Sequence, residues 1–241
     1  DEYAFVSQHI GDMENLETLN HFQRTVDLYQ KLFRIRPEIV AYDLHPEYLS
    51  TKYALRLPGD KIGVQHHFAH MASCLAENGE RGPVIGLAFD GLGFGADGNL
   101  WGGEFLVGDY GSFERRAHFE YVPMPGGAAA IQDPWRMALS YLYTFLGREG
   151  LMKHLPLFAQ ATEEKIRVIL RQIDRQVNSP RTSSCGRLFD AVSALLELCF
   201  SVSHEGQAAV ELEMIADPGE DGAYEFFAEE EEGREIIRLK P

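Results

Sequence analysis

The chain has 241 residues, of which 45% are hydrophobic and 24% charged, and its formal net charge is −15 at pH 7. This composition is that of a globular protein long enough to bury a core, in one large domain or two smaller lobes. The acidic excess argues against binding to nucleic-acid backbones or to anionic membrane surfaces, because both call for clustered Lys and Arg. No apolar run reaches the roughly 18 residues that a membrane span needs.

The cysteines and the N-terminus indicate the cellular compartment. Cys74, Cys185 and Cys199 show no CxxC spacing, so free thiols and a cytoplasmic protein are expected rather than a disulfide framework. The first residues include no methionine and do not have the basic and apolar regions of a signal peptide. A strand-like segment at residues 3–7 begins almost at once, so we expect a piece cut from a longer chain.

The first third of the chain alternates helical and strand-like patterns. Apolar residues at spacings of three and four predict an amphipathic helix over residues 12–34, with Asp12 as its N-cap. Pro37 ends this pattern. The further elements expected here are short strands at 39–42 and 62–64, a helix opened by Pro46, and a helix over 65–77 that Asn78-Gly79 terminates.

Glycine is concentrated in the next region, where nine of the 23 glycines lie between Gly86 and Gly111. A strand is expected at 84–89, and Asp97-Gly98 predicts a β-hairpin. The acidic run 229–232 is expected to be a solvated turn or edge. The remaining expectations are a loop at 121–127, helices at 133–146, 163–177, 187–200 and 205–215, and strands at 224–227 and 235–239.

This order of elements predicts an α/β protein. We expect two lobes, residues 1–81 and 82–241, with a cleft between them.

The densest chemical signal is a group of histidines, since three of the nine fall within five positions. His66 and His70 are one helical turn apart on one face, a spacing that lets two imidazoles bind one metal ion. The glutamate of the HExxH motif is absent, so the chain is not a zinc protease of that class. Zinc or iron would suit imidazole and carboxylate ligands together. A polar helix start with hydrogen-bonded histidines is the alternative.

A carboxylate at the end of a strand is the second signal. Asp90 follows the apolar strand 84–89 and precedes the glycines, so it is placed to point into a cleft. The glycines allow positive φ angles and could leave backbone N–H groups for an anion. The spacing matches neither the Walker A motif nor the Rossmann fingerprint. A tight hairpin that binds nothing is the alternative.

The third signal is SSCGRLFD at residues 183–190, a Ser/Gly-rich loop that leads into a helix. Such an N-terminus suits an anion, and Arg187 could contact a phosphate. Asp190 could accept hydrogen bonds from ribose hydroxyls or simply favour the helix dipole. A capped helix without a ligand is the alternative. Cys185 has no base near it in the sequence, so it is not expected to be a nucleophile.

Several long strings, taken together, resemble one family. In chain order they are VQHHFAHMASCLAENG, FDGLGFGADGNLWGGEF, PMPGGAAAIQDPWRMAL, SSCGRLFDAVSALL and HEGQAAVELE. They are similar to the C-terminal Kae1-like domain of the HypF carbamoyltransferases of nickel–iron hydrogenase maturation. FVSQHIGDMENLET at 5–18 and DLHPEYLST at 43–51 match as well. Antibiotic O-carbamoyltransferases and the tRNA threonylcarbamoyladenosine enzymes share the fold but match these strings less closely.

The resemblance implies a two-lobed fold of the actin/hexokinase/Hsp70 class (ASKHA), with a nucleotide in the cleft. In the family, a YrdC-like domain makes carbamoyl-adenylate from carbamoyl phosphate and ATP. The Kae1-like domain then transfers the carbamoyl group to the C-terminal cysteine of a partner, HypE. The thiocarboxamide later becomes the thiocyanate that supplies the cyanide ligands of the hydrogenase iron.

The resemblance also implies roles for individual residues. His66, His70 and Asp90 fall on the family's ligands for a divalent metal, zinc or iron. His67 would contact the substrate or assist acid/base chemistry. Residues that fall on the nucleotide site are Gly91, Gly93, Gly126, Gly127, Arg187, Asp190 and Glu205.

The chain also departs from the family pattern. The first strand and turn, the glycine-rich C-terminal segment with a fourth, aspartate ligand, and the acylphosphatase-like, zinc-finger and YrdC-like domains are not in these 241 residues. We therefore expect weak or no metal retention and no complete reaction by this piece alone. Two other functions stay open, namely O-carbamoyl transfer to a small-molecule hydroxyl and a noncatalytic module that docks a partner.

Overall fold

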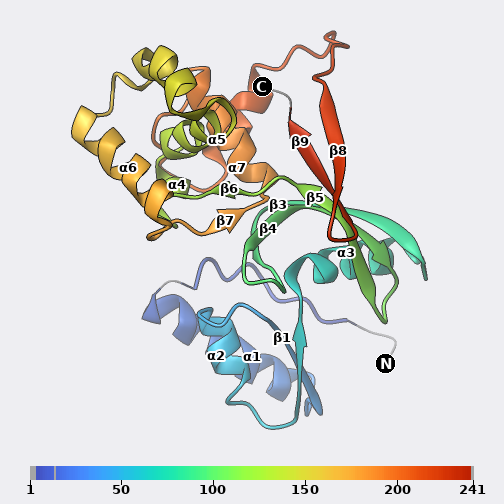
Figure 1. Cartoon of the computed structure of the whole chain (residues 1–241). Helices are drawn as coiled ribbons and strands as arrows, with labels where there is room; N and C mark the ends of the chain where they lie inside the picture. Colours follow the sequence, from blue (N-terminus) through green and yellow to red (C-terminus); the bar gives the residue numbers. More distant parts are fainter. Residues whose placement is uncertain (1–3, 14, 240–241) are drawn as a thin grey trace. The chain divides into compact units, whose positions relative to one another are not determined.

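The computed structural model describes residues 4–13 and 15–239, which divide between His66 and His67 into two compact units (Figure 1). Helices and strands occur in both units, which confirms the predicted α/β class. Within the described residues, no helix combines the length and the apolar character needed to cross a membrane. The division into lobes at residues 81 and 82 stays a prediction.

The N-terminal unit is built around two parallel strands, β1 (Ile39–Asp43) and β2 (Asp60–Val64). Their connection carries α2 (Leu49–Ala54), which contacts β1, and α1 (Leu16–Leu32) precedes them. The register aligns Asp43 with Val64. Because parallel strands run in the same direction, both strands end at the same edge of this small sheet.

The predicted start of the chain is partly wrong. Asn15 rather than Asp12 caps α1, because the Asn15 side-chain oxygen accepts the N–H of Thr18 at 2.9 Å. Residues 4–7 form no strand, and Tyr3 lies outside the described residues. The helix expected at Pro46 begins only at Leu49, after a short turn.

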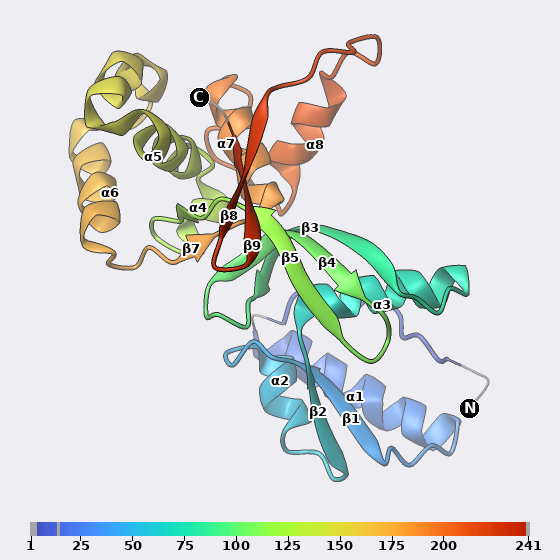
Figure 2. The same ribbon diagram turned by 45° about the vertical axis from the view of Figure 1, so that its right-hand side comes forward.

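The C-terminal unit contains a mixed sheet whose centre is an antiparallel meander (Figure 2). The predicted hairpin at Asp97-Gly98 joins its first two strands. The meander consists of β3 (Val84–Phe94), β4 (Leu100–Gly108) and β5 (Phe113–Phe119). The sheet is extended by β6 (Val122–Pro123), β7 (Arg181–Thr182), β8 (Phe226–Glu231) and β9 (Arg234–Leu239). β6 lies inside the segment predicted as a loop.

Helix α3 (His66–Asn78) packs against this meander. Met71 is buried with Ala88 and Leu106, and Phe68 stacks on Phe113 with ring centroids 4.9 Å apart. The buried side of α3 also includes His67 and Leu75. The packing therefore fixes which histidines face inward and which face outward.

A helical block between β6 and β8 holds the largest core. Trp135 stacks on Phe200 there, with ring centroids 5.4 Å apart. Gly147 interrupts its longest helix with a φ of 66°. The helices are α4 (Ala129–Gln132), α5 (Trp135–His154), the 3-10 turn η1 (Leu155–Phe158), α6 (Glu163–Arg175), α7 (Cys185–Leu195) and α8 (Gln207–Met214).

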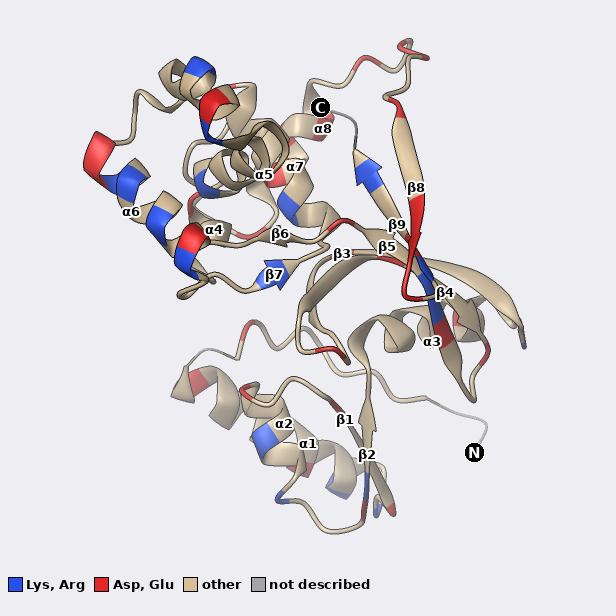
Figure 3. Cartoon of the chain, in the orientation of Figure 1, with Lys and Arg blue, Asp and Glu red and all other residues tan. Residues whose placement is uncertain are grey.

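The acidic run near the C-terminus forms an exposed edge strand and turn, as predicted (Figure 3). Every described side chain of β8 is exposed. Arg238 of β9 offsets part of this charge, since its Nε lies 2.6 Å from a carboxylate oxygen of Glu229 and its guanidinium also pairs with Glu231 and Glu120.

Candidate functional site

The three clustered histidines lie in the first turns of α3 and differ in exposure. The His67 ring is completely buried, at 6.0 Å from the Trp101 ring centroid. The His70 side chain is 53% exposed and that of His66 is 26% exposed. The helical period explains the difference, because His66 and His70 share one face while His67 and Met71 share the buried one.

Asp90 reaches the histidines because the β3–β4 pairing breaks beside it. The register shifts between Phe89 and Gly93, so Asp90 lies in an irregular stretch of β3. One carboxylate oxygen, Oδ1, accepts the N–H of Gly91 at 2.6 Å. The other, Oδ2, lies 3.6 Å from Nε2 of His67 and 3.6 Å from Nε2 of His70. The irregularity therefore points this carboxylate at α3.

The predicted metal ligands are brought together. One ligand atom from each of His66, His70 and Asp90 lies within 4.8 Å of the other two. Two imidazoles and a carboxylate form the donor set that zinc and iron accept. Among the described residues this is the one group of three or more His, Cys, Asp or Glu side chains with such spacing. The residues present therefore fit a divalent metal.

The second and third sequence signals also meet. The Ser184 hydroxyl donates to the backbone carbonyl of Asp90 at 2.9 Å and to that of Gly91, and it accepts the N–H of Arg187 as the cap of α7. A Cβ atom on Gly186 would lie 2.9 Å from the Gly91 Cα, so the two backbones touch. Ser184 thus fixes the start of α7 against the strand that carries Asp90.

Arg187 and Asp190 form a buried ion pair one turn into α7, with Nε and Oδ2 2.9 Å apart. Burial raises the pKa of Asp190 to about 6, and the attraction of Arg187 only partly opposes this. Burial also lowers the pKa of Arg187, and the attraction of the carboxylates of Asp190, Glu205 and Asp90 only partly opposes this. Both shifts have the same cause, since removing the two charges from water outweighs their attraction.

The glycines predicted to line the nucleotide site have different structural environments. Gly126 and Gly127 have φ angles of 92° and 56° in a turn after β6, and Gly93 pairs with Trp101 in the β3–β4 ladder. The N–H of Gly126 donates to Asn178 and that of Gly127 to Met124. Since these amides already donate within the chain, neither is a free donor for an anion, and a Cβ on Gly126 would lie 2.7 Å from the Arg136 guanidinium. Glu205 is exposed in the turn before α8.

A buried polar network, which the sequence did not reveal, supports the hairpin. The Glu104 carboxylate is fully buried and accepts hydrogen bonds from Gly102, Gly103 and Ser183. Its Oε2 lies 2.5 Å from Nε of Arg115. The sequence signal that could have predicted the burial of Arg115 is the alternation of side chains along β5, because Arg115 shares one face of the strand with Phe113 and Ala117.

Arg115 connects this carboxylate to the tip of the hairpin. Its guanidinium lies 3.9 Å from the Trp101 ring centroid and 3.2 Å from Asp97. Burial alone would raise the pKa of Asp97, but hydrogen bonds from Tyr121, Asn99 and Trp101 outweigh it and hold the pKa at about 2. The tip is therefore anchored by an ionised carboxylate.

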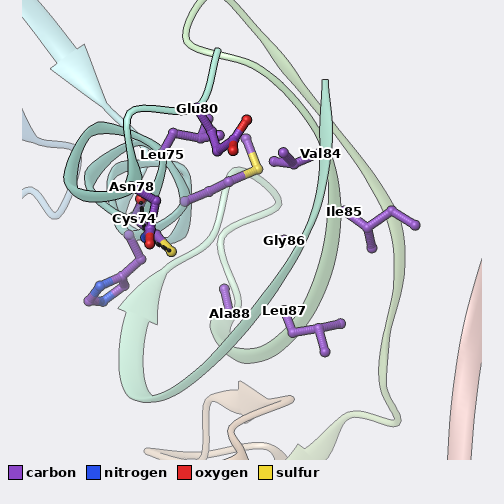
Figure 4. A pocket seen from close by; sticks show the side chains of 11 residues that line it. Cys74, Leu75, Asn78, Glu80, Val84, Ile85, Gly86, Leu87 and Ala88 are labelled. Carbon is purple, nitrogen blue, oxygen red and sulfur yellow. Dashed lines mark hydrogen bonds between the residues drawn. The ribbon is translucent and has the colours of Figure 1, made fainter. Parts of the chain in front are cut away.

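An apolar hollow adjoins the exposed histidine. It has a volume of about 330 Å³ and lies between α3 and β3, from His70 to Ala88 (Figure 4). Aliphatic side chains such as Leu75, Val84 and Leu87 dominate its lining, and Glu80 is its one Asp or Glu. The lining includes no Lys or Arg side chain.

The family models match the chain in two consecutive parts. A model described as the HypF Kae1-like domain matches residues 1–77. A second model, described as the second subdomain of the carbamoyltransferase Kae1-like domain, matches residues 86–241. The chain belongs to the HypF carbamoyltransferase family. The predicted Kae1-like fold is thereby confirmed.

Relatives in this family are much longer than the chain. The carbamoyltransferase HypF2 of Cupriavidus necator is 41% identical over 218 residues, which are 89% of this chain and 26% of that protein. The HypF of Rhodobacter capsulatus is 41% identical over 221 residues, with coverages of 88% and 29%. A crystal structure of full-length HypF in a phosphate- and nucleotide-bound form superimposes with a TM-score of 0.89 at 45% identity, covering 98% of this chain and 30% of that one.

Proposed function

We propose that this chain is the carbamoyl-transfer part of a HypF-type enzyme, with carbamoyl-adenylate as donor and the C-terminal cysteine thiol of a HypE-like protein as acceptor. The observation that carries the proposal is the arrangement of His66, His70 and Asp90, together with the seat of α7 directly behind Asp90. The family membership supplies the reaction class.

His66, His70 and Asp90 would hold a zinc or iron ion, whose Lewis acidity stabilises negative charge that develops on a carbonyl or phosphate oxygen. His67 is completely buried beside Asp90, so its position favours orienting that carboxylate over touching the substrate. Arg187 would contact the nucleotide phosphate and Asp190 the ribose. Gly91, where an added Cβ would meet nothing within 4 Å, would allow the nucleotide to approach the backbone.

The transfer step needs no nucleophile from this chain. The acceptor thiolate sulfur attacks the carbonyl carbon of carbamoyl-adenylate, a C–S bond forms, and the bond from that carbon to the phosphate oxygen breaks to release AMP. Burial raises the pKa of Cys185 and of Cys199, so neither thiol is activated as a thiolate.

The wider arrangement belongs to the same proposal. Residues 1–81 and 82–241 would form the two lobes around the nucleotide. A YrdC-like domain of the same enzyme would make the adenylate from carbamoyl phosphate and ATP. Cys74, Cys185 and Cys199 are free, which supports a cytoplasmic location.

The test is carbamoyl transfer by the full-length protein to a peptide with the HypE C-terminus, with carbamoyl phosphate and ATP supplied. Mass spectrometry would detect the thiocarboxamide. We expect His70→Ala to abolish transfer, while His154→Ala, a change of an exposed histidine on α5, leaves it intact. Carbamoylation of a sugar hydroxyl instead of the peptide would favour the O-carbamoyltransferase alternative. Full activity of His70→Ala would favour a docking module.

A further inference from the structure

A carboxylate outside the predicted ligand set contacts one of the predicted ligands. Asp43 is the last residue of β1, and its Oδ2 lies 2.6 Å from Nδ1 of His66. Both side chains are mostly buried, with 21% of Asp43 and 26% of His66 exposed. The contact is therefore shielded from solvent more than a surface ion pair is.

Asp43 is held in place independently of His66. Its Oδ1 accepts the N–H of His45 at 2.7 Å, and its backbone carbonyl accepts the hydroxyl of the buried Thr51 at 2.8 Å. The strand pairing aligns Asp43 with Val64, two residues before His66. The sheet edge thus presents a fixed acceptor to the first residue of α3.

This contact determines where the His66 ring carries its proton. An ionised carboxylate can only accept a hydrogen bond, so Nδ1 of His66 must be the donor. In the neutral ring the lone pair then lies on Nε2, which is the form that binds a metal ion. Histidine ligands commonly donate their second N–H to a carboxylate, which fixes the orientation of the ring and increases its basicity.

We propose that Asp43 is a positioning residue of the metal centre, which holds His66 in the Nδ1–H tautomer with Nε2 directed to the ion. The inference rests on the proposed function, because it assigns Asp43 to that same site. It also gives a role to the DLHPEYLST segment, of which Asp43 is the first residue.

The test compares Asp43→Asn and Asp43→Leu with Thr51→Val in the full-length protein. Thr51→Val is the matched control, because it removes the hydrogen bond to the Asp43 backbone and leaves the carboxylate in place. Zinc affinity is measured by competition with a chromophoric chelator. We expect Asp43→Leu to raise the Kd for zinc by about 10-fold to 100-fold. Asp43→Asn keeps an acceptor and should raise it less, while Thr51→Val leaves it within about twofold.

A second measurement does not depend on metal binding or activity. Nitrogen-15 NMR of the metal-free protein reports which His66 ring nitrogen is protonated. We expect Nδ1–H in the wild type and in Thr51→Val, and loss of this preference in Asp43→Leu. A wild-type protein that binds no zinc but shows this pattern would refute the proposed metal centre and retain the positioning role. An Nε2–H or doubly protonated ring in the wild type, or a zinc Kd unchanged in Asp43→Leu, would overturn the inference.

Discussion

Glu104 and Arg115 provide a quantitative test of the buried network. The Glu104 side chain has no exposed area and that of Arg115 is 3% exposed, so each charge depends on the other in place of water. Breaking such a pair by removing one partner costs about 3–5 kcal/mol of unfolding free energy. Arg115 keeps Asp97 and the Trp101 ring in Glu104→Gln, so we expect a loss near the lower limit, about 3 kcal/mol.

The effects of removing the two charges on the unfolding free energy should also be non-additive. Arg115→Met leaves the Glu104 carboxylate with its bonds to Gly102, Gly103 and Ser183, and we expect a similar loss of about 3 kcal/mol. The double variant removes both charges, so it should cost less than the sum by about 2 kcal/mol.

Urea denaturation followed by tryptophan fluorescence measures these values, since both tryptophans, Trp101 and Trp135, belong to the C-terminal unit. The matched control is the exposed pair Glu114 and Arg116, also on β5, where neutralisation should change stability by less than about 1 kcal/mol. Strict additivity of the two buried changes, or a loss in Glu104→Gln no larger than in the control, would refute the reasoning.

Three further outcomes follow from the site. Asp97 has a pKa of about 2 in the fold and 3.8 in the unfolded chain, so its ionised carboxylate stabilises the fold by about 2 kcal/mol above about pH 4. This contribution is lost as the pH falls through 2. Asp97→Asn should remove that part of the acid sensitivity, measured by denaturation at a series of pH values. For Asp190 the change of stability with pH has the opposite sign. Because its folded pKa is about 6, the unfolding free energy should fall by up to about 3 kcal/mol as the pH rises from 4 to 6. The same fall with pH in Asp190→Asn would contradict this. Gly186→Ala should lower the unfolding free energy by about 1–3 kcal/mol, because its Cβ meets the Gly91 backbone. Gly91→Ala has open space around the new methyl group, so it should change stability by less than about 0.5 kcal/mol. We expect Gly91→Ala to weaken nucleotide binding, measured by calorimetry.

Local patterns predicted the parts of the site that depend on neighbours in the sequence. The spacing of His66 and His70 follows from the helical period, and Asp90 from its place at the end of an apolar stretch. The fold class and the hairpin at Asp97-Gly98 rest on the same kind of signal. The family that the longer strings resemble is the one to which the chain belongs.

The features that could not be predicted depend on pairing between distant segments. Nothing near Asp43 indicates that it contacts His66, because the contact follows from the parallel register of β1 and β2. The burial of Glu104 and Arg115 depends on their pairing across β4 and β5, since burial of either one alone would be unfavourable. β6 and β7 have two residues each and exist only because they pair with each other and, through β7, with β4.

The hydrogen bonds from Ser183 to Glu104 and from Ser184 to Asp90, which hold the start of α7 against the sheet, have a consequence for the order of folding. Ser183 and Glu104 are 79 residues apart in the sequence, and Ser184 and Asp90 are 94 apart. Closing loops of this length loses more chain entropy than closing a hairpin, so the meander and the helices between these segments can form before the two ends meet. The proposed substrate site would then be among the last parts of the unit to assemble, and a nascent chain would acquire it only after α7 has been synthesised.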